Sequence, residues 1–436
     1  MQYSCTNFNL MLIYKRGNAM IEEITFNNYR FFSNSKLSFF ADRRTKKLLS
    51  NSIKIDNRQV LKTMALYGGN NSGKTNVIFF LRLLKRILEG RGIQPFNNAI
   101  FGDPKNTSCS ITYNNNDGNG WYKYSFTISN ENKEFLSERL SHIVYYDTGY
   151  PREDILFDLD RESHLLKIFD ADKHMLLDFI IGDKSIVYSI RTESGEFQQL
   201  NSFKESFKKL SESIEIVDLN NFPIDKTLDA LKGNNEKKKK FIVSFVKHAD
   251  LSIENFSYRK DIAIANNAGL IAEKAMRDLE RMTDAFKLTT TYGKANVPSI
   301  FFDSAGTKKI EGIASHIYDA LSEGKLLVID EMDNGLHFML TRAIVSLFNN
   351  IANEKAQLLF TAHDLLLIDC SNLLRKEQIY MISRKKDHAT IYCLSESTVA
   401  NTGLREGGDI LKRYYKGEFG YVPSPTFISD LLSLRE

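Results

Sequence analysis

The residues best suited to chemistry in this chain run from Gly68 to Thr75 and read Gly-Gly-Asn-Asn-Ser-Gly-Lys-Thr, the pattern G-x-x-x-x-G-K-[ST]. Glycines in such a loop let the backbone curl, so that successive N–H groups point at phosphate oxygens, and a following helix adds its positive N-terminal end. We therefore expect Lys74 to bridge the β- and γ-phosphates of ATP, and Thr75 to ligate Mg²⁺. The predicted nucleotide contacts here are Gly68, Gly69, Asn70, Asn71, Ser72, Gly73, Lys74, Thr75 and Asn76.

A second motif, Leu326-Leu-Val-Ile-Asp330-Glu331, is an apolar strand pattern that ends in two carboxylates. Asp330 suits a water-mediated contact to Mg²⁺, and Glu331 suits a base that polarises the water attacking the γ-phosphate. Alone, such a pair is equally compatible with the cap of a helix. The phosphate loop upstream favours the catalytic interpretation, so we predict ATP hydrolysis with ATP and Mg²⁺ bound.

Three shorter motifs surround the acidic strand. Asp303-Ser-Ala-Gly-Thr307 opens a predicted helix upstream, Asp333-Asn-Gly-Leu-His337 follows the strand, and Phe360-Thr-Ala-His363-Asp364 ends the next strand. The stretch between Lys74 and Glu331 is too long for a small kinase or GTPase without a large insertion.

In this order, the motifs resemble those of the ABC-type ATPases of the SMC, RecF and OLD kind. The resemblance implies that Ser304 and Gly306 grip the γ-phosphate held by an opposite protomer, so that a homodimer or higher homo-oligomer completes each site. It also implies that Asp333 is the D-loop aspartate and that His363 is the switch histidine, a catalytic residue beside Lys74 and Glu331. The sequence departs from the pattern at Ser-Ala-Gly-Thr, where transporters have Leu-Ser-Gly-Gly-Gln, and at Phe338, where a proline often stands.

The segment Leu411–Pro423 resembles the Tyr-x-x-Gly-x-Phe-Gly-x-x-Pro ending of a bacterial branch that includes RloA and AbiL-type proteins linked to phage defence. This resemblance implies a nucleotide-driven switch or scaffold in anti-phage defence, controlling a separate effector such as a TOPRIM-type nuclease. The alternative is a DNA-binding repair or chromosome-associated ATPase of the RecF/SMC type. Gln94 is the one candidate for a Q-loop glutamine, although a surface role fits it better.

Strands and helices must hold these motifs in place, and their patterns predict an α/β fold. A strand pattern at 62–67 runs into the phosphate loop, and apolar residues at helical spacing predict a helix over 74–89. After residue 300, predicted helices (306–322, 340–353) alternate with apolar strands (325–330, 356–361, 378–383). Uninterrupted apolar strands between helices indicate a mainly parallel sheet covered on both faces.

The rest of the chain predicts an antiparallel β lobe and a largely helical insert. Strand patterns occur at 21–32, 108–137 and 184–191, whereas 201–290 is charged and mostly helical in pattern. We therefore divide an ABC-type P-loop ATPase head into a poorly ordered leader (1–19), an N-terminal half with the β lobe (20–145), an insert (146–295) and a C-terminal half (296–436). The run Glu236-Lys-Lys-Lys-Lys240 fits a solvated helix face better than a binding site.

The composition restricts the partners and the compartment. The chain has 436 residues and a net charge of +4, which leaves a nucleic-acid partner open. Its four cysteines lie far apart without a CxxC pair, which favours reduced thiols in a cytoplasmic protein, and no apolar run reaches the length of a membrane span. Asp364, Asp369 and Asp387 form no TOPRIM-like constellation, so we expect any nuclease to be a separate protein.

Overall fold

The computed structural model describes most of the chain. The described residues are 18–93, 106–116, 118, 120–146, 150–163, 165–168, 171–174, 182–189, 198–219, 223–259, 284–369, 372–385, 388–396 and 432–433.

A six-stranded sheet forms the centre of the molecule, in the order β12-β16-β17-β5-β18-β19. The first five strands pair in parallel and β19 pairs antiparallel to β18, which agrees with the predicted mainly parallel sheet. The strand bounds are β5 (Thr63–Tyr67), β12 (Ile214–Asp218), β16 (Leu326–Asp330), β17 (Gln357–Ala362), β18 (Ile379–Lys385) and β19 (His388–Cys393).

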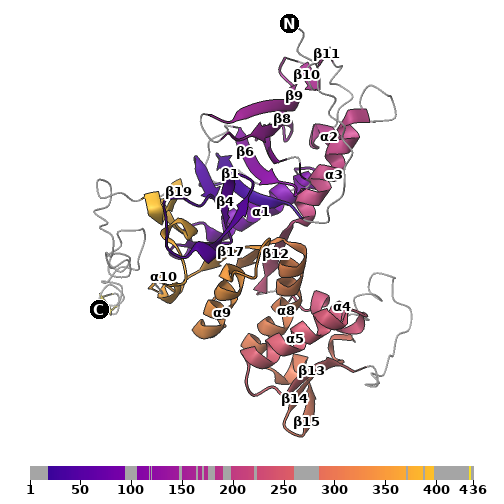
Figure 1. Ribbon diagram of the computed structural model, residues 1–436, viewed down its shortest axis with the longest axis vertical. Helices are drawn as coiled ribbons and strands as arrows, with labels where there is room; N and C mark the ends of the chain where they lie inside the picture. Colours follow the sequence, from indigo (N-terminus) through magenta and orange to yellow (C-terminus); the bar gives the residue numbers. More distant parts are fainter. Residues whose placement is uncertain are drawn as a thin grey trace.

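Helices cover both faces of this sheet because its side chains are apolar on both sides. In β5, Met64 and Leu66 join one buried core, whereas Ala65 and Tyr67 join the other. α1 (Lys74–Leu88) and α3 (Gln198–Glu212) pack into the first core, while α8 (Ala305–Glu323) and α9 (Phe338–Asn349) pack into the second (Figure 1).

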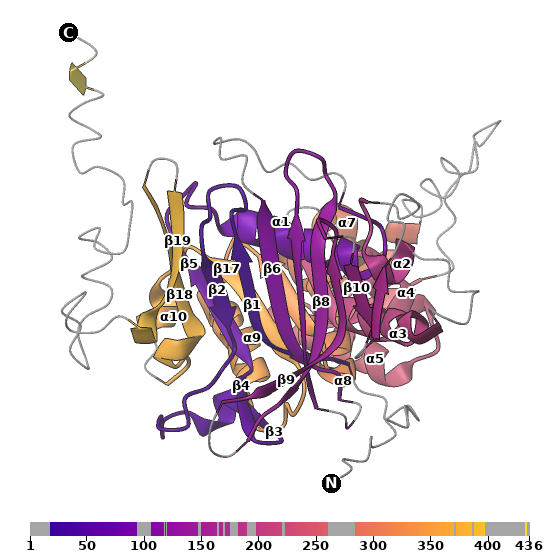
Figure 2. The ribbon, with the colours of Figure 1, turned by 90° about the horizontal axis from the view of Figure 1, so that it is seen from above.

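An eight-stranded antiparallel sheet closes the first core, in the order β11-β10-β9-β8-β7-β6-β1-β2 (Figure 2). Its inner face is apolar, and Phe26 of β1 stacks on Phe80 of α1 with ring centroids 4.3 Å apart. The helix α1 is therefore held between the two sheets. The strand bounds are β1 (Met20–Asn27), β2 (Ser35–Ser38), β6 (Thr107–Asn114), β7 (Trp121–Ile128), β8 (Phe135–Val144), β9 (Arg152–Asp160), β10 (Leu165–Ile168) and β11 (Ala171–His174).

The remaining elements form a small lobe against α8 and some connecting pieces. The lobe contains α4 (Asp225–Lys232), α5 (Glu236–Ala249), α7 (Ser299–Phe302) and the three-stranded sheet of β13 (Asn255–Tyr258), β14 (Leu288–Tyr292) and β15 (Ala295–Pro298). The connecting pieces are β3 (Ser52–Ile55), β4 (Arg58–Leu61), α2 (Ile186–Ser189), α10 (Leu366–Asp369) and the 3₁₀ turns Leu49–Asn51, Lys376–Gln378 and Leu394–Glu396.

Several predictions about the middle of the chain differ from the structure. Residues 186–189 of the predicted strand 184–191 form the helix α2, because Tyr188 and Ser189 donate backbone N–H groups to the carbonyl of Ser185. The segment predicted as mostly helical contains β12, β13 and the start of β14. Strands of the predicted insert join both large sheets, since β9 to β11 extend the antiparallel sheet and β12 pairs with β16.

The four lysines of the run 237–240 differ in their surroundings. Lys238 forms an ion pair with Asp319 and Lys239 one with Glu236, whereas Lys237 and Lys240 are exposed on α5. At the N-terminus, Ala19 of the predicted leader is buried and its N–H donates to Ser213 Oγ at 2.7 Å.

Other predictions fall outside the described residues: leader residues 1–17, Gln94, Asp387 and the segment 411–423. Among the described helices, none combines the length and the apolar character needed to cross a membrane.

Candidate functional site

The phosphate loop joins β5 to α1 and depends on two glycines. Gly73 has a φ of 115°, and a Cβ there would lie 2.8 Å from the ring of Phe32. A Cβ on Gly68 would lie 2.5 Å from Ser72 Oγ and 2.7 Å from the carbonyl oxygen of Ile382. Any side chain at either position would displace the loop, so both glycines are required by this backbone path.

Lys74 lies at the centre of the loop, and its ammonium is held by carbonyl groups. Its Nζ donates to the carbonyl oxygens of Gly68 at 2.7 Å and Gly69 at 3.1 Å, and it lies 3.5 Å from His363 Nδ1. Burial lowers the pKa of Lys74 to about 8, against the opposing effect of nearby carboxylates. Among the described residues, no carboxylate lies within ion-pairing distance of this ammonium, so an anion in the loop would be stabilised by it.

Other polar groups of the loop are also suited to binding a phosphate. The Ser72 hydroxyl is buried and has no hydrogen-bond partner in the described part of the chain, whereas Thr75 is exposed at the start of α1. A buried polar group without a partner costs about 1–3 kcal/mol, which a ligand oxygen could recover. Thr75 and Asp330 are the residues that could hold Mg²⁺ beside that ligand.

The two carboxylates that end β16 are tied to β17 through a threonine. The Thr361 hydroxyl donates to Asp330 Oδ1 at 2.6 Å and accepts the backbone N–H of Glu331 at 2.7 Å. Sequence reasoning missed Thr361, although it directly precedes Ala362 and His363 in a motif already singled out. One buried hydroxyl therefore orients a predicted Mg²⁺ ligand, Asp330, and a predicted catalytic residue, Glu331.

Glu331 has an unusual backbone conformation. Its φ is 51°, in the left-handed region that a non-glycine residue seldom adopts. Asn334 Nδ2 donates to Glu331 Oε2 at 3.1 Å, which fixes one carboxylate oxygen. Strained backbone of this kind occurs often at functional sites, where the surrounding structure stabilises it.

Asp333 links the predicted D-loop to the predicted switch residue. Its Oδ2 accepts backbone N–H groups from His363 at 2.7 Å and Asp364 at 2.5 Å. Burial, followed by the charge of Lys74, lowers the pKa of His363, which favours the neutral imidazole at pH 7. Lys74, Glu331, Asp333 and His363 are thus gathered at the carboxyl ends of β5, β16 and β17.

The predicted signature lies on the other side of the D-loop. Ser304 caps α8 by accepting the N–H of Thr307 at 3.0 Å, and a Cβ on Gly306 would lie 2.6 Å from the carbonyl oxygen of Gly335. Lys309 Nζ donates to the carbonyl oxygen of Asn334 at 2.7 Å. Within the described residues, no hydrogen bond or ion pair joins Ser304 or Gly306 to the phosphate loop, so the structure does not bond these two predicted parts together.

Two arginines beside the phosphate loop were not predicted. Arg30 Nη1 donates to Asn76 Oδ1, and Arg384 Nη1 donates to the carbonyl oxygen of Asn71 at 3.3 Å. The Arg384 guanidinium also lies 3.7 Å from the ring centroid of Phe31. The polar-aromatic stretch that follows β1 was the available signal, because an arginine between aromatic residues is typical of a stacked, positioned cation.

Solved structures of known proteins resemble this chain at low sequence identity. They include an SMC head bound to the C-winged helix domain of ScpA (TM-score 0.46, 12% identity, 87% of this chain and 99% of that one). The SMC head domain from Thermotoga maritima has a TM-score of 0.42 at 11% identity, covering 86% of this chain and 98% of that one. The recombination mediator protein RecF-ATPrS has a TM-score of 0.35 at 12% identity, covering 87% of this chain and 99% of that one. No curated protein sequence matches the chain.

A family profile matches residues 64–369, a range that includes the phosphate loop, the acidic strand, the D-loop and His363. That range covers more than half of the chain. The chain therefore belongs to the family described as "AAA domain, putative AbiEii toxin, Type IV TA system".

Proposed function

We propose that this protein binds ATP with Mg²⁺ and hydrolyses it to ADP and phosphate, at a site that two copies complete. The observation that carries the proposal is the convergence of Lys74, Asp330, Glu331 and His363 at one sheet edge, around an ammonium that forms no ion pair with any carboxylate of the described residues. Such an edge offers one cation for phosphate oxygens and one carboxylate for the attacking water.

Each residue has a role in this proposal. Lys74 and the loop N–H groups hold the β- and γ-phosphates, and the neutral His363 donates a hydrogen bond toward the γ-phosphate. Glu331 orients and deprotonates the attacking water, with its backbone fixed by Thr361 and its carboxylate by Asn334. Mg²⁺, held through Thr75 and Asp330, would neutralise charge on the phosphates.

The composite site rests on the position of the signature. Gly306 packs against the carbonyl oxygen of Gly335 in the chain's own D-loop. Within the described residues, neither Ser304 nor Gly306 forms a hydrogen bond with the phosphate loop, so both can approach the nucleotide of a second copy. ATP would then hold two copies together, and hydrolysis would release them. A homodimer with two equivalent sites is the simplest closed assembly.

The first test replaces the base. We expect Glu331→Gln to lower phosphate release by about 100-fold or more and to stabilise an ATP-dependent dimer that ultracentrifugation detects. Glu162→Gln, on an exposed turn, is the matched control and should behave as wild type. Equal phosphate release by wild type and Glu331→Gln would contradict the role of Glu331. A mass that ATP leaves unchanged in both proteins would contradict the shared site.

We further propose that the ATPase acts in the cytoplasm as a switch in anti-phage defence and controls a separate effector such as a TOPRIM-type nuclease. The resemblance of the segment Leu411–Pro423 to the ending of RloA and AbiL-type proteins supports this role, and so does the family description. Phage plating on cells that carry the chain with its neighbouring genes tests it. Lys74→Ala should abolish any protection, and the absence of protection by the wild type would contradict the proposal.

A DNA-binding ATPase of the RecF/SMC type is the second candidate, and exposed lysines on α5 favour it. Lys237, Lys240 and Lys247 are exposed and form no ion pair within the described residues, and they span about 15 Å of helix. Replacement of all three by glutamine should weaken binding to duplex DNA and reduce its salt dependence. Salt-independent binding, or equal binding by the variant, would contradict this candidate.

A further inference from the structure

Two neighbouring phenylalanines are exposed directly before the predicted signature. Phe301 and Phe302, at the end of α7, are 67% and 66% exposed, and Ser304 follows two residues later. Large exposed aromatic side chains that cluster together are typical of a surface that a partner covers. The two phenylalanines together are therefore a candidate contact surface for a partner.

The segment that carries these rings is fixed by its neighbours. Asp303 is buried and accepts hydroxyl groups from Thr290 and from Tyr292, the latter at 2.7 Å. The ring of Phe286 stacks on that of Phe301 with centroids 5.1 Å apart and an interplanar angle of 14°. Because the segment is already ordered, little conformational entropy would be lost when a partner covers it.

A complementary surface lies beside the phosphate loop. Phe79 is 37% exposed on α1, and it follows Thr75 by four residues, so both side chains lie on the same face of the helix. The guanidinium groups of Arg30 and Arg82 lie 4.7 Å and 5.6 Å from the centroid of this ring. An aromatic ring next to two guanidinium groups is a surface that favours another aromatic ring.

If the composite site forms, both surfaces lie near the nucleotide between the two copies, and this step rests on the proposed function. In that site, Ser304 of one copy and Thr75 of the other flank the same nucleotide. Phe301 and Phe302 are within about 11 Å of Ser304 along the chain, and Phe79 is about one turn, or roughly 6 Å, from Thr75. Both surfaces therefore lie at the same interface, on its two opposing sides.

We propose that Phe301 and Phe302 of one copy dock against the Phe79 surface of the second copy, made by Phe79, Arg30 and Arg82. In a symmetric dimer this contact forms twice, once beside each nucleotide. The contact couples closure of the dimer to the position of the signature, because Phe302 and Ser304 belong to one fixed segment. Nucleotide binding to a single copy does not involve it.

The test uses the full chain with Glu331→Gln, so that ATP is retained. We expect Phe301→Ala with Phe302→Ala to weaken the ATP-dependent dimer by at least tenfold in ultracentrifugation. The affinity of the single copy for a fluorescent ATP analogue should stay unchanged. Ile351→Ala is the matched control, since Ile351 is 80% exposed and lies after α9, away from the signature, and it should leave dimerisation unchanged.

A cross-linking experiment locates the contact directly. Copies with Phe79→Cys are mixed with copies carrying Phe301→Cys, and a short bis-maleimide should join them only when ATP is present. If the parent Glu331→Gln dimerises but the double alanine variant dimerises equally well, or no cross-link forms, the docking contact is wrong and the shared site stands. If the parent does not dimerise with ATP, both proposals are wrong.

Discussion

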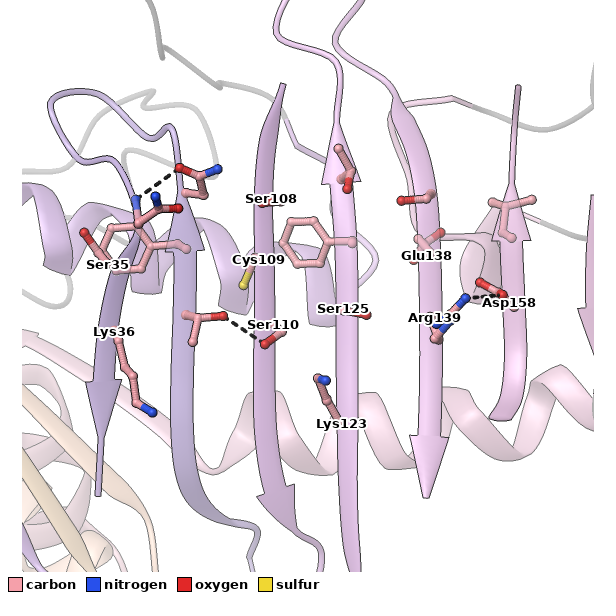
Figure 3. A pocket seen from close by; sticks show the side chains of 18 of the residues that line it. Ser35, Lys36, Ser108, Cys109, Ser110, Lys123, Ser125, Glu138, Arg139 and Asp158 are labelled. Atoms are coloured by element: carbon pink, nitrogen blue, oxygen red, sulfur yellow. Dashed lines mark hydrogen bonds and ion pairs between the residues drawn. The ribbon is translucent and has the colours of Figure 1, made fainter. Parts of the chain in front are cut away.

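The outer face of the antiparallel sheet and the phosphate-loop edge both carry basic side chains, but the two regions differ in whether carboxylates pair with those side chains. On the outer face, a hollow of about 790 Å³ is lined largely by serine, threonine and charged residues (Figure 3). Arg139 forms an ion pair with Asp158 at 2.6 Å and Lys36 forms one with Glu23 at 2.7 Å. Cations on this face are thus neutralised by carboxylates of neighbouring strands.

At the phosphate-loop edge, Lys74 is held by carbonyl oxygens and has no such partner among the described residues. Basic residues alone therefore do not identify an anion-binding site. A bound phosphate adds little electrostatic stabilisation to a cation that a carboxylate already neutralises. It stabilises a partly desolvated cation without a counterion much more. The hollow on the outer face is therefore the poorer candidate for nucleotide binding.

The largest effect we expect comes from removing the unneutralised charge. Lys74→Ala should weaken ATP binding by roughly 100-fold, since a hydrogen bond to a charged group contributes about 1.5–3 kcal/mol. Calorimetric titration with ATP and Mg²⁺ measures this. Lys36→Ala is the matched control on the outer face and should leave the affinity unchanged. Equal losses in the two variants would contradict the comparison.

Thr361→Val should have the next largest effect on activity, because it removes the hydroxyl that orients Asp330 and Glu331. We expect phosphate release to fall by roughly tenfold, which corresponds to about 1.4 kcal/mol. Thr361→Ser keeps the hydroxyl and should retain most of the activity. A valine variant with the wild-type rate would show that the strained backbone of Glu331 does not need this bond.

The pH dependence of stability should reveal a buried acid near the signature. Glu311 of α8 is fully buried, and burial, followed by the neighbouring Asp303, raises its pKa to about 10. Above the unfolded pKa of about 4.5 the unfolded chain loses this proton while the folded protein keeps it, so the group destabilises folding progressively up to about pH 10. Glu311→Gln should therefore be the more stable protein at neutral pH.

The gap between Glu311→Gln and wild type should widen with pH by up to about 1.4 kcal/mol per unit. Denaturant unfolding at pH 6, 7 and 8 measures this gap. Glu323→Gln, at the exposed end of the same helix, is the control for the substitution itself. A gap that stays constant across this range would mean that Glu311 is ionised in the folded protein.

The smallest effect should come from the outer face itself. Arg139→Gln with Asp158→Asn removes a partly exposed ion pair, and such pairs contribute about 0–1 kcal/mol. We expect ATP binding to stay unchanged and the free energy of unfolding to fall by no more than this amount. A clear loss of ATP affinity would show that the outer face takes part in nucleotide binding.

Local sequence patterns were sufficient to predict the parts of the molecule that depend on spacing along the chain. The phosphate loop lies between a strand and a helix as predicted, the carboxylates of Asp330 and Glu331 follow an apolar strand, and His363 follows the next strand. These features are readable because turn chemistry and apolar periodicity act over a few residues. The parallel sheet followed from the same patterns.

Contacts between distant segments became visible only in the folded chain. The tertiary structure paired β12 with β16, packed Phe32 against Gly73, and placed Arg30 and Arg384 beside the loop. It also separated the signature from the chain's own phosphate loop, which is the observation behind the shared site. No local pattern encodes these neighbours, because they depend on which strands align and on how the two buried cores fill, and that is settled by packing across the whole chain.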